Sequence, residues 1–379
     1  MDSLLRHTTR QVPKIIDWIE QLVKIESPSN DPAAVNHAVE FVADRLAGEA
    51  KVKRYRAKGF GDHLRLEFLL PGRRKESRVL GIGHLDTVYP MGALASMPFK
   101  RAKGRLWGPG VFDMKSGVTY FVFAARVLRE LDIPVMRRFV VQLNSDEEVG
   151  SPTSRVHTEK EAKKSVAALI AEPSAGPEGN AKTARKGGGG FRISVKGVAA
   201  HAGLDFAAGA SAILELARQI DTVAGWTDLD KGITINPGLI QGGTATNTVA
   251  AEAWAEIDVR VPRKPDARRI EKKFASLKPF DRRTQVTVEG GLRRPPMERN
   301  RQTLGIYRLA RKLSSKLGVD LGEAQVGGGS DGNFTAALGL PTLDGIGAVG
   351  EKAHSPGECI YENRIADRVA LIAKLIAAL

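Results

Sequence analysis

The stretch Phe139–Ser151 reads Phe-Val-Val-Gln-Leu-Asn-Ser-Asp-Glu-Glu-Val-Gly-Ser, and it joins an apolar run to three consecutive acids. The apolar run is typical of a buried β-strand. The acids Asp146, Glu147 and Glu148 follow where that strand should end. Like charges that are packed together repel one another and resist removal from water, so a buried triplet needs positive charge nearby. The stretch therefore indicates either an acidic surface patch or a charged site at a strand end.

Two further apolar strands are expected to end in acidic or imidazole side chains. Val79–Gly83 leads into His84 and Asp86, and Val166–Ala171 leads into Glu172. Alternate residues of a strand point to the same face, so His84 and Asp86 can point the same way. Helical patterns separate these strands, which favours an α/β fold with a mixed, mainly parallel sheet and helices on both faces. Ligands of such open sheets gather at the C-terminal ends of the strands.

The pattern of elements changes after the glycine-rich segment Lys186–Gly190. The expected order becomes strand, helix, strand, strand, helix, strand, which is the split arrangement of a ferredoxin-like domain. These elements cover Phe191–Lys196, Ala207–Ala224, Ile233–Gln241, Ala251–Val261, Asp266–Leu277 and Thr284–Glu289. We therefore expect an α+β domain over residues 187–292, inserted into a first domain that is made of residues 1–186 and 293–379.

Composition limits the classes of partner. The chain has 379 residues and a formal net charge of +14. The basic excess is scattered, except in Arg263–Arg283. Within this segment, the periodicity of Asp266–Lys278 favours a helix with one solvated basic face. No aromatic-rich stacking pattern accompanies this segment, so it gives little support for nucleic-acid binding.

The expected location is the cytoplasm. Cys359 is the single cysteine, which excludes an internal disulfide framework and suits a reducing compartment. We expect an inert thiol there, because no base is arranged beside it in the sequence. No apolar run approaches the ~18 residues that a membrane helix needs, and no signal-peptide pattern is present.

Five imidazole or carboxylate side chains follow predicted strands or lie in loops beside them. They are His84, Asp113, Glu148, Glu172 and His354. Mixed imidazole and carboxylate ligation suits catalytic Zn²⁺, and less selectively Co²⁺ or Mn²⁺. Five ligands are too many for one tetrahedral catalytic zinc, but they suffice for two ions if one carboxylate bridges. Such a pair would neutralise the acidic triplet and would leave a neighbouring glutamate free as a general base.

Two other classes of protein compete with this hypothesis. Gly328–Gly332 satisfies the Gly-x-Ser-x-Gly pattern of serine hydrolases, and Asp344 and His354 follow in the order of a catalytic triad. No clear apolar strand precedes Ser330, however, and the upstream imidazole and carboxylate residues would then have no purpose. A binding module that uses the basic face of Arg263–Arg283 is the second alternative, and it predicts nucleic-acid retention without metal-dependent hydrolysis.

Six short motifs occur in order along nearly the full chain. They are Gly83–Val88, Gly108–Gly117, Asp146–Ser151, Glu172–Ser174, His201–Gly203 and Gly328–Asp331. Together they resemble the M20 family of metallopeptidases, most closely its glutamate carboxypeptidase branch. The resemblance implies a zinc exopeptidase-like catalytic domain, an inserted lid domain that also forms a dimer, and two zinc ions per chain.

The resemblance also implies how the five candidate ligands are shared. Asp113 would bridge the two ions. His84 and Glu172 would complete one metal site, and Glu148 and His354 would complete the other. The peptide bond that follows Asp113 would be cis.

Further roles follow from the same resemblance. Glu147 would be the general base, which takes a proton from the attacking water and passes it to the leaving amine. Asp86 would orient and polarise His84. His201 of the lid would stabilise the developing oxyanion in the active site of the partner subunit.

Substrate contacts are expected from the lid and from a glycine turn. Asn247 would contact the substrate, and Arg260 would bind its terminal carboxylate with a planar guanidinium. Gly328 and Gly329 would let the backbone approach the same substrate closely. No catalytic task follows for Asp146, and a structural role is expected for it.

These inferences predict a co-catalytic di-zinc hydrolase that cleaves an amide bond next to a free carboxylate. The favoured version releases a C-terminal glutamate or similar amino acid from peptides or from N-acyl and folate-like conjugates. An N-acyl amino acid deacylase, of the acetylornithine deacetylase or succinyl-diaminopimelate desuccinylase type, would use the same metal site. The expected partners are such small substrates and a second copy of the chain, with no nucleic acid and no membrane.

Overall fold

The computed structural model describes residues 2–73 and 76–379, and the chain divides into two compact units. The first unit runs to Ala184 and resumes at Arg299–Val326 and Ser330–Leu379. The second unit consists of Arg185–Glu298 and Gly327–Gly329. The second unit therefore contains the whole of the expected insertion, residues 187–292, and adds a short glycine segment. The assignment of catalytic and lid roles to these units stays a prediction.

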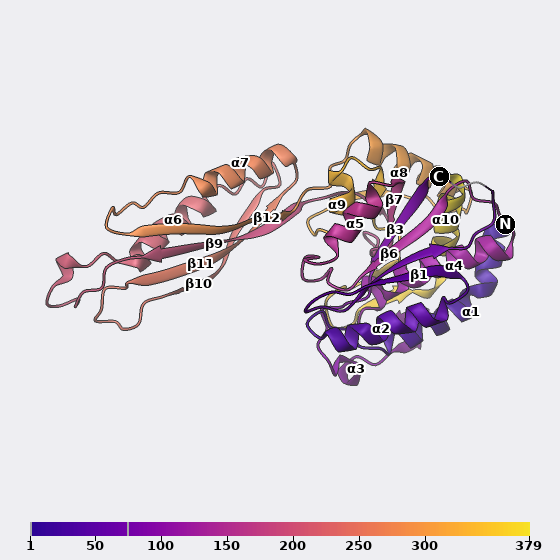
Figure 1. The fold of residues 1–379 in the computed structure, drawn as a ribbon, viewed down its shortest axis with the longest axis horizontal. Helices are drawn as coiled ribbons and strands as arrows, with labels where there is room; N and C mark the ends of the chain where they lie inside the picture. The colour runs from indigo at the N-terminus through magenta and orange to yellow at the C-terminus, as the bar shows by residue number, and fades with distance from the viewer. Residues whose placement is uncertain (1, 74–75) are drawn as a thin grey trace. The chain divides into compact units, whose positions relative to one another are not determined.

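A six-stranded sheet forms the centre of the first unit (Figure 1). Its strands, in spatial order, are β1 (Ala50–Tyr55), β2 (His63–Phe68), β6 (Arg138–Asn144), β3 (Arg78–His84), β7 (Ser165–Ile170) and β14 (Thr342–Leu343). The last four run parallel to one another, whereas β1 and β2 form an antiparallel edge. The predicted mixed, mainly parallel sheet is confirmed.

Helices cover both faces of this sheet. They are α1 (Ser3–Val23), α2 (Pro32–Arg45), α4 (Ser116–Glu130), α5 (Arg155–Ala162), α8 (Arg301–Ser315), α9 (Gly332–Ala337) and α10 (Ile365–Ala378). The unit also contains the four-residue helix α3 (Ala93–Ser96). Successive residues of β3 face opposite sides of the sheet, and each side packs against its own layer of helices. Gly81 and Gly83 face the side chains of α4 and of the segment before it, whereas Leu80 and Ile82 belong to a smaller core cluster with Ala162 of α5.

Short strands that the sequence patterns do not predict bring distant loops together. A small sheet has the order β15 (Gly350–Glu351), β16 (Cys359–Tyr361), β5 (Arg105–Trp107) and β4 (Lys100–Ala102). A two-stranded sheet pairs β13 (Glu323–Val326) with β8 (Ala181–Arg185). The pairing of β5 with β16 fixes the segment before Asp113 beside the segment after His354.

The second unit has one four-stranded antiparallel sheet with the order β10 (Thr234–Gly242), β11 (Glu252–Val261), β9 (Gly187–Lys196) and β12 (Gln285–Arg294). With α6 (Ala212–Ala224) and α7 (Lys264–Ala275), the chain order is the predicted strand, helix, strand, strand, helix, strand. The expected helix from Ala207 begins later, because Ser211 caps α6 and a separate short turn precedes it.

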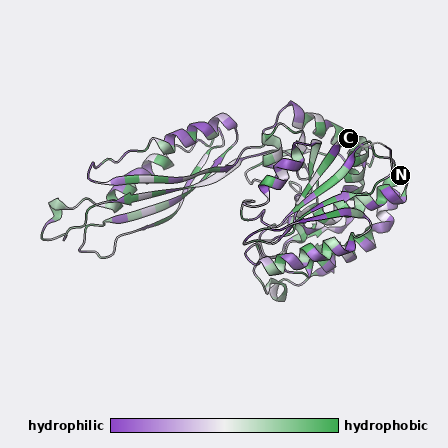
Figure 2. Cartoon of the chain, in the orientation of Figure 1, coloured by the Kyte–Doolittle hydropathy of each residue, from purple (hydrophilic) through white to green (hydrophobic). Residues whose placement is uncertain are grey.

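The core of the second unit lies between its sheet and its helices. Phe191 stacks on Phe274 with ring centroids 3.8 Å apart. Ile270 and Phe274 are the buried residues of α7, and the rest of that helix is largely hydrophilic (Figure 2). The expected solvated basic helix in Arg263–Arg283 is therefore present. Among the described residues, no helix combines the length and the apolar character needed to cross a membrane.

Candidate metal centre

The five candidate ligands all belong to the first unit. Three of them stand at or just after the C-terminal ends of parallel strands: His84 ends β3, Glu148 follows β6 and Glu172 follows β7. Asp113 lies in η1 (Val111–Lys115), a short irregular segment before α4. His354 lies in the loop between β15 and β16. The sheet therefore gathers these side chains at one edge, as expected for an open α/β fold.

The ligand atoms form two groups that share one carboxylate. His84, Asp113 and Glu172 form the first group, and Asp113, Glu148 and His354 form the second. Within each group the ligand atoms lie within 4.8 Å of one another. Asp113 Oδ1 lies 3.1 Å from His84 Nε2, and Asp113 Oδ2 lies 3.1 Å from His354 Nε2. A carboxylate that offers one oxygen to each group has the geometry of a bridging ligand.

The donor atoms fit divalent cations. Glu172 Oε1 lies 3.7 Å from His84 Nε2, and Glu148 Oε1 lies 3.2 Å from His354 Nε2. Glu148 Oε1 is buried, and apart from this contact with His354 it has no hydrogen-bond partner among the described residues. A buried carboxylate oxygen with so few partners is costly, and a cation would compensate its charge. Imidazole nitrogen with carboxylate oxygen is a donor set that suits zinc, cobalt and manganese.

His84 is oriented by its far nitrogen. Its Nδ1–H donates to the main-chain carbonyl of Asp86 at 2.8 Å, whereas the Asp86 carboxylate lies 3.6 Å away. This bond fixes the ring so that Nε2 faces Asp113 and Glu172. The sequence-based expectation placed this orienting contact on the carboxylate of Asp86, but the shorter contact is to its carbonyl.

The carboxylate of Asp86 contacts the acidic stretch instead. It accepts the backbone N–H groups of Glu147 and Glu148 at 3.2 and 3.1 Å. It also accepts the hydroxyl of Ser29 at 2.7 Å. Burial raises the pKa of Asp86 to about 6. Asp86 therefore connects β3 to the segment that carries Glu147 and Glu148, and Ser29 is a contributor that sequence reasoning missed.

The two histidines compensate the charge of the carboxylates. Burial opposes protonation of His84, but Asp113 and the charges of Asp86 and Glu148 outweigh it and raise its pKa well above the ordinary value. The Asp113 and Glu148 carboxylates raise the pKa of His354 to about 10. Burial disfavours the charged form of Asp113, yet both imidazoles lower its pKa further than burial raises it. The two metal ions that the sequence analysis expects as the positive charge near the acidic triplet stay a prediction.

The three acids of the triplet lie in different surroundings. Asp146 is fully buried, and its Oδ2 accepts the backbone N–H groups of Thr153 and Ser154 at 2.7 and 3.1 Å. Asp146 therefore holds the backbone that follows the triplet, which agrees with the structural role expected for it. Glu148 belongs to the second ligand group, whereas Glu147 belongs to neither. The assignment of Glu147 as general base stays a prediction. The peptide bond Asp113–Met114 is cis, as the resemblance implies.

The serine hydrolase alternative does not agree with the contacts of its residues. The buried hydroxyl of Ser330 donates directly to the Asp344 carboxylate, with no imidazole between them. His354 instead contacts Asp113 and Glu148. The geometry needed for an imidazole to activate Ser330 is not present in the described part of the chain.

The predicted lid residues lie in the second unit. His201 Nδ1 accepts the backbone N–H groups of Gly203 and Leu204, each at 3.1 Å. A neutral imidazole that accepts at Nδ1 carries its proton on Nε2, so His201 Nε2 is a donor. The N–H of Ala202 donates to the carbonyl of Asn247 at 2.9 Å. The His201 and Asn247 loops are thus held side by side.

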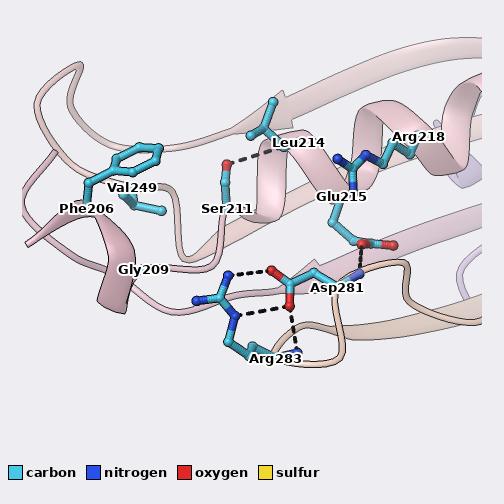
Figure 3. A pocket seen from close by; sticks show the side chains of 9 residues that line it. All are labelled: Phe206, Gly209, Ser211, Leu214, Glu215, Arg218, Val249, Asp281 and Arg283. Carbon is cyan, nitrogen blue, oxygen red and sulfur yellow. Dashed lines mark hydrogen bonds and ion pairs between the residues drawn. The ribbon is translucent and has the colours of Figure 1, made fainter.

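The segment that follows His201 also lines a pocket of the second unit (Figure 3). Buried Glu215 accepts the backbone N–H groups of Phe280 and Asp281. Asp281 pairs with both sides of the Arg283 fork, and Arg283 Nη1 donates to the carbonyl of Ala207 at 3.0 Å. These contacts fix the 206–209 segment, and nothing in the sequence pattern indicates them.

The other expected substrate contacts are partly engaged within the second unit. Arg260 donates Nε and Nη2 to Asp258 at 2.8 and 2.9 Å, so a substrate carboxylate would meet the Nη1 edge of its guanidinium. The carbonyls of Gly328 and Gly329 each accept from Arg185 Nη1 at 3.1 Å. A Cβ on Gly329 would lie 2.5 Å from Arg294 Cδ, whereas one on Gly328 would meet nothing within 4 Å.

A mainly parallel sheet with imidazole and carboxylate groups at its strand ends is an arrangement that suits a metal-dependent hydrolase. Residues 81–378 match the peptidase family M20/M25/M40, and the chain belongs to this family of metal-dependent peptidases and amidohydrolases.

Two curated relatives and one solved structure illustrate the similarity. The chain is 27% identical to carboxypeptidase G2 of Pseudomonas sp. (strain RS-16) over 382 residues, which covers 98% of this chain and 91% of the relative. It is 28% identical to a succinyl-diaminopimelate desuccinylase of Cereibacter sphaeroides, with 80% and 84% covered. The aminopeptidase PepT of Bacillus cereus has a TM-score of 0.79 at 21% identity, with 97% and 98% covered, and shares the fold.

Proposed function

We propose that this chain is a di-metal carboxypeptidase that hydrolyses an amide bond next to a free carboxylate and releases a C-terminal glutamate or a similar amino acid. The observation that supports the proposal most directly is the position of the Asp113 carboxylate between two histidines. Its Oδ1 and Oδ2 each lie 3.1 Å from the Nε2 atom of a different one. His84 and Glu172 would hold one ion with Asp113. Glu148 and His354 would hold the other with the same carboxylate.

Two divalent ions, when bound, polarise a carbonyl and lower the pKa of a water. Glu147 would take a proton from the attacking water and pass it to the leaving amine. Asp86 keeps Glu147 in place, because its carboxylate accepts the Glu147 N–H at 3.2 Å. The donor Nε2–H of His201 would stabilise the carbonyl oxygen in the active site of the partner subunit as negative charge develops on it. Arg260 binds the terminal carboxylate with the edge that Asp258 leaves open.

The similarity to carboxypeptidase G2 over 98% of this chain supports the carboxypeptidase version. The similarity to a desuccinylase supports an N-acyl amino acid deacylase as the second candidate. Both reactions cleave an amide beside a carboxylate, so the metal centre alone does not separate them.

Zinc as the metal, a cytoplasmic location and a homodimer formed through the second unit belong to the same proposal. Imidazole with carboxylate ligation supports zinc. The single cysteine, buried Cys359, suits a reducing compartment. Exposed apolar side chains on the edge strand β10, Leu239 and Ile240, support a self-association surface.

A substrate panel tests the proposal. Peptides and N-acyl conjugates that end in glutamate would be assayed beside N-acetyl and N-succinyl amino acids, with product amines quantified by chromatography. We expect glutamate release that chelation with EDTA abolishes and added Zn²⁺ restores. Rapid deacetylation or desuccinylation without glutamate release would show that the chain is an N-acyl amino acid deacylase and not a carboxypeptidase. Activity that survives complete metal removal would overturn both versions.

The variant Glu147→Gln tests the assignment of the base. Removing a general base should lower kcat by at least ~10²-fold, because base catalysis typically contributes 10²–10⁴-fold. The metal content, measured by elemental analysis, should stay at the wild-type value. Loss of metal from this variant would mean that Glu147 is a ligand, and unchanged kcat would mean that another residue is the base.

A further inference from the structure

A buried carboxylate outside the proposed ligand set lies at the centre of the loops that carry it. Glu358 has no exposed surface and follows His354 by four residues. We propose that Glu358 is a positioning residue of the metal centre, which holds the backbone of Asp113 against the turn that carries His354. This inference rests on the proposed function, since it concerns the same two ions.

One oxygen of Glu358 binds the backbone of the bridging residue. Oε1 accepts the N–H of Phe112 at 2.7 Å and the N–H of Asp113 at 2.9 Å. Both bonds are charge-assisted, and such bonds are roughly twice as strong as neutral ones. Because Asp113 supplies both of its oxygens to the metal groups, a shift of its backbone would displace ligands of both groups together.

The other oxygen of Glu358 binds two further donors. Oε2 accepts the hydroxyl of Tyr89 and the N–H of Gly110, the latter at 3.2 Å. The Tyr89 oxygen also lies 3.2 Å from the carbonyl of Ser355, next to His354. Four donors therefore surround one buried carboxylate. Such a set compensates the cost of burying its charge.

The backbone around Glu358 joins the same two segments. The N–H of Glu358 donates to the Ser355 carbonyl at 3.2 Å, which closes the turn 355–358 directly after His354. The turn that contains His354 is closed by the N–H of Ser355, which donates to the Lys352 carbonyl at 3.3 Å. The carbonyl of Glu358 accepts the N–H of Gly108 at 3.3 Å, and the next residue begins β16, which pairs with β5. His354 has φ 59°, a conformation uncommon for a non-glycine residue, so its turn needs such support.

The amide variant Glu358→Gln separates this role from simple space filling. Glutamine has nearly the same volume, but it retains one acceptor oxygen and replaces the other with an NH₂ donor. In either orientation of the glutamine amide, its NH₂ group faces a backbone N–H group that previously donated to the carboxylate. With NH₂ at the Oε1 position, Phe112 and Asp113 lose their acceptor. With NH₂ at the Oε2 position, Gly110 loses its acceptor, and the Tyr89 hydroxyl must accept instead of donate.

Metal affinity is the main readout, measured by competition between the metal-free protein and a chromophoric chelator for Zn²⁺. Loss of a residue that orients metal ligands typically lowers affinity 10–100-fold. We expect Glu358→Gln to weaken both bound ions by ~10–100-fold. Glu172→Gln, which removes a ligand of one group, should weaken mainly one ion. The visible absorption of the Co²⁺-loaded protein should change in Glu358→Gln.

Tyr89→Phe is the matched control, because it removes one donor to Oε2 and leaves both Oε1 bonds intact. We expect it to change affinity by less than ~5-fold, since one hydrogen bond contributes about 1 kcal/mol. Saturating Zn²⁺ should restore most of the kcat of Glu358→Gln, because Glu358 does not touch the substrate. The same treatment should not restore Glu147→Gln.

The outcomes separate this inference from the proposed function. A wild-type protein that binds no divalent ion would overturn the proposed function. A wild-type protein that binds two ions, with Glu358→Gln binding both equally well, would overturn only the positioning role. Circular dichroism checks folding of each metal-free variant. If Glu358→Gln does not fold, Glu358→Asp decides, since its shorter carboxylate should weaken both ions and unchanged binding there would overturn the role.

Discussion

At the scale of single residues, Asp146 shows how the acidic triplet is held. Its Oδ2 accepts the hydroxyl of Thr153 at 2.6 Å, and that hydroxyl oxygen lies 3.0 Å from His63 Nε2. The N–H of Ser145 donates to His63 Nδ1 at 3.2 Å. Because Nδ1 accepts, the ring is neutral with its proton on Nε2. His63 thus supports the strand end from which Glu147 and Glu148 follow.

The buried His63 predicts a stability that depends on pH. Burial lowers the pKa of His63 below its ordinary value of 6.5. The unfolded chain therefore binds the proton more readily, so this contribution is intact above pH ~6.5 and stability is lost as pH falls below that value. One proton contributes at most ~1.4 kcal/mol per pH unit. Urea unfolding of wild type and His63→Gln between pH ~5 and ~8 should show a shallower acid loss in the variant.

The control for this experiment is His37→Gln, because His37 is exposed on α2. It should keep the pH dependence of the wild type. Equal acid slopes in wild type and His63→Gln would show that His63 does not stay neutral in the folded protein.

At the scale of elements, the approach of α4 to the end of β7 sets the spacing of two ligands. Helix α4 begins three residues after Asp113, and β7 ends two residues before Glu172. A Cβ on Gly117 would lie 1.9 Å from the carbonyl oxygen of Ala171. Only glycine allows this distance, so α4 packs directly on the backbone that leads to Glu172.

Two glycine-to-alanine changes in helices should therefore have opposite effects. Gly117→Ala should lower the free energy of unfolding by ~1–3 kcal/mol, the usual cost of overpacking. Gly305 lies in α8, where a Cβ would meet nothing within 4 Å. Gly305→Ala should raise the free energy of unfolding by ~0.4–1 kcal/mol. Chemical denaturation measures both changes, and destabilisation of equal size in the two variants would contradict the packing argument.

At the scale of the whole molecule, each unit has its own apolar core, and all proposed metal ligands belong to the first unit. The second unit has β10 at one edge of its sheet. Leu239 and Ile240 on that strand are 57% and 65% exposed. An edge strand with exposed apolar side chains offers unpaired backbone groups to a second chain.

A charge on this edge should therefore separate the proposed homodimer. Ile240→Arg should give a monomer in light scattering, whereas the wild type should give a dimer. Leu229→Arg is the control, since Leu229 is 75% exposed but lies outside β10. The Leu229→Arg variant should have the same dimer mass in light scattering as the wild type. Both variants should bind metal as the wild type does, and a wild-type monomer would disprove the assembly.

Much of the fold and of the candidate centre follows from local patterns in the sequence. Apolar runs of strand length and helical periodicity locate the parallel strands and the inserted domain, because burial of one face imposes a short-range order on apolar residues. Polar residues directly after β3, β6 and β7 indicate that the site lies at their ends. The identities of His84, Asp113, Glu148, Glu172 and His354 then predict the chemistry of the ligands.

The remaining features depend on residues that are far apart in the chain. Glu358 accepts from Phe112 across 246 positions, and β5 pairs with β16 over three residues. No local propensity specifies such a partner, since a single carboxylate or a three-residue strand is compatible with many. Likewise, the choice of the Asp86 carbonyl over its carboxylate, and the sharing of Asp113 between two histidines, depend on distances that arise only when the strands are packed. Chain composition predicts which chemistry is available, whereas tertiary packing decides which atoms carry it out.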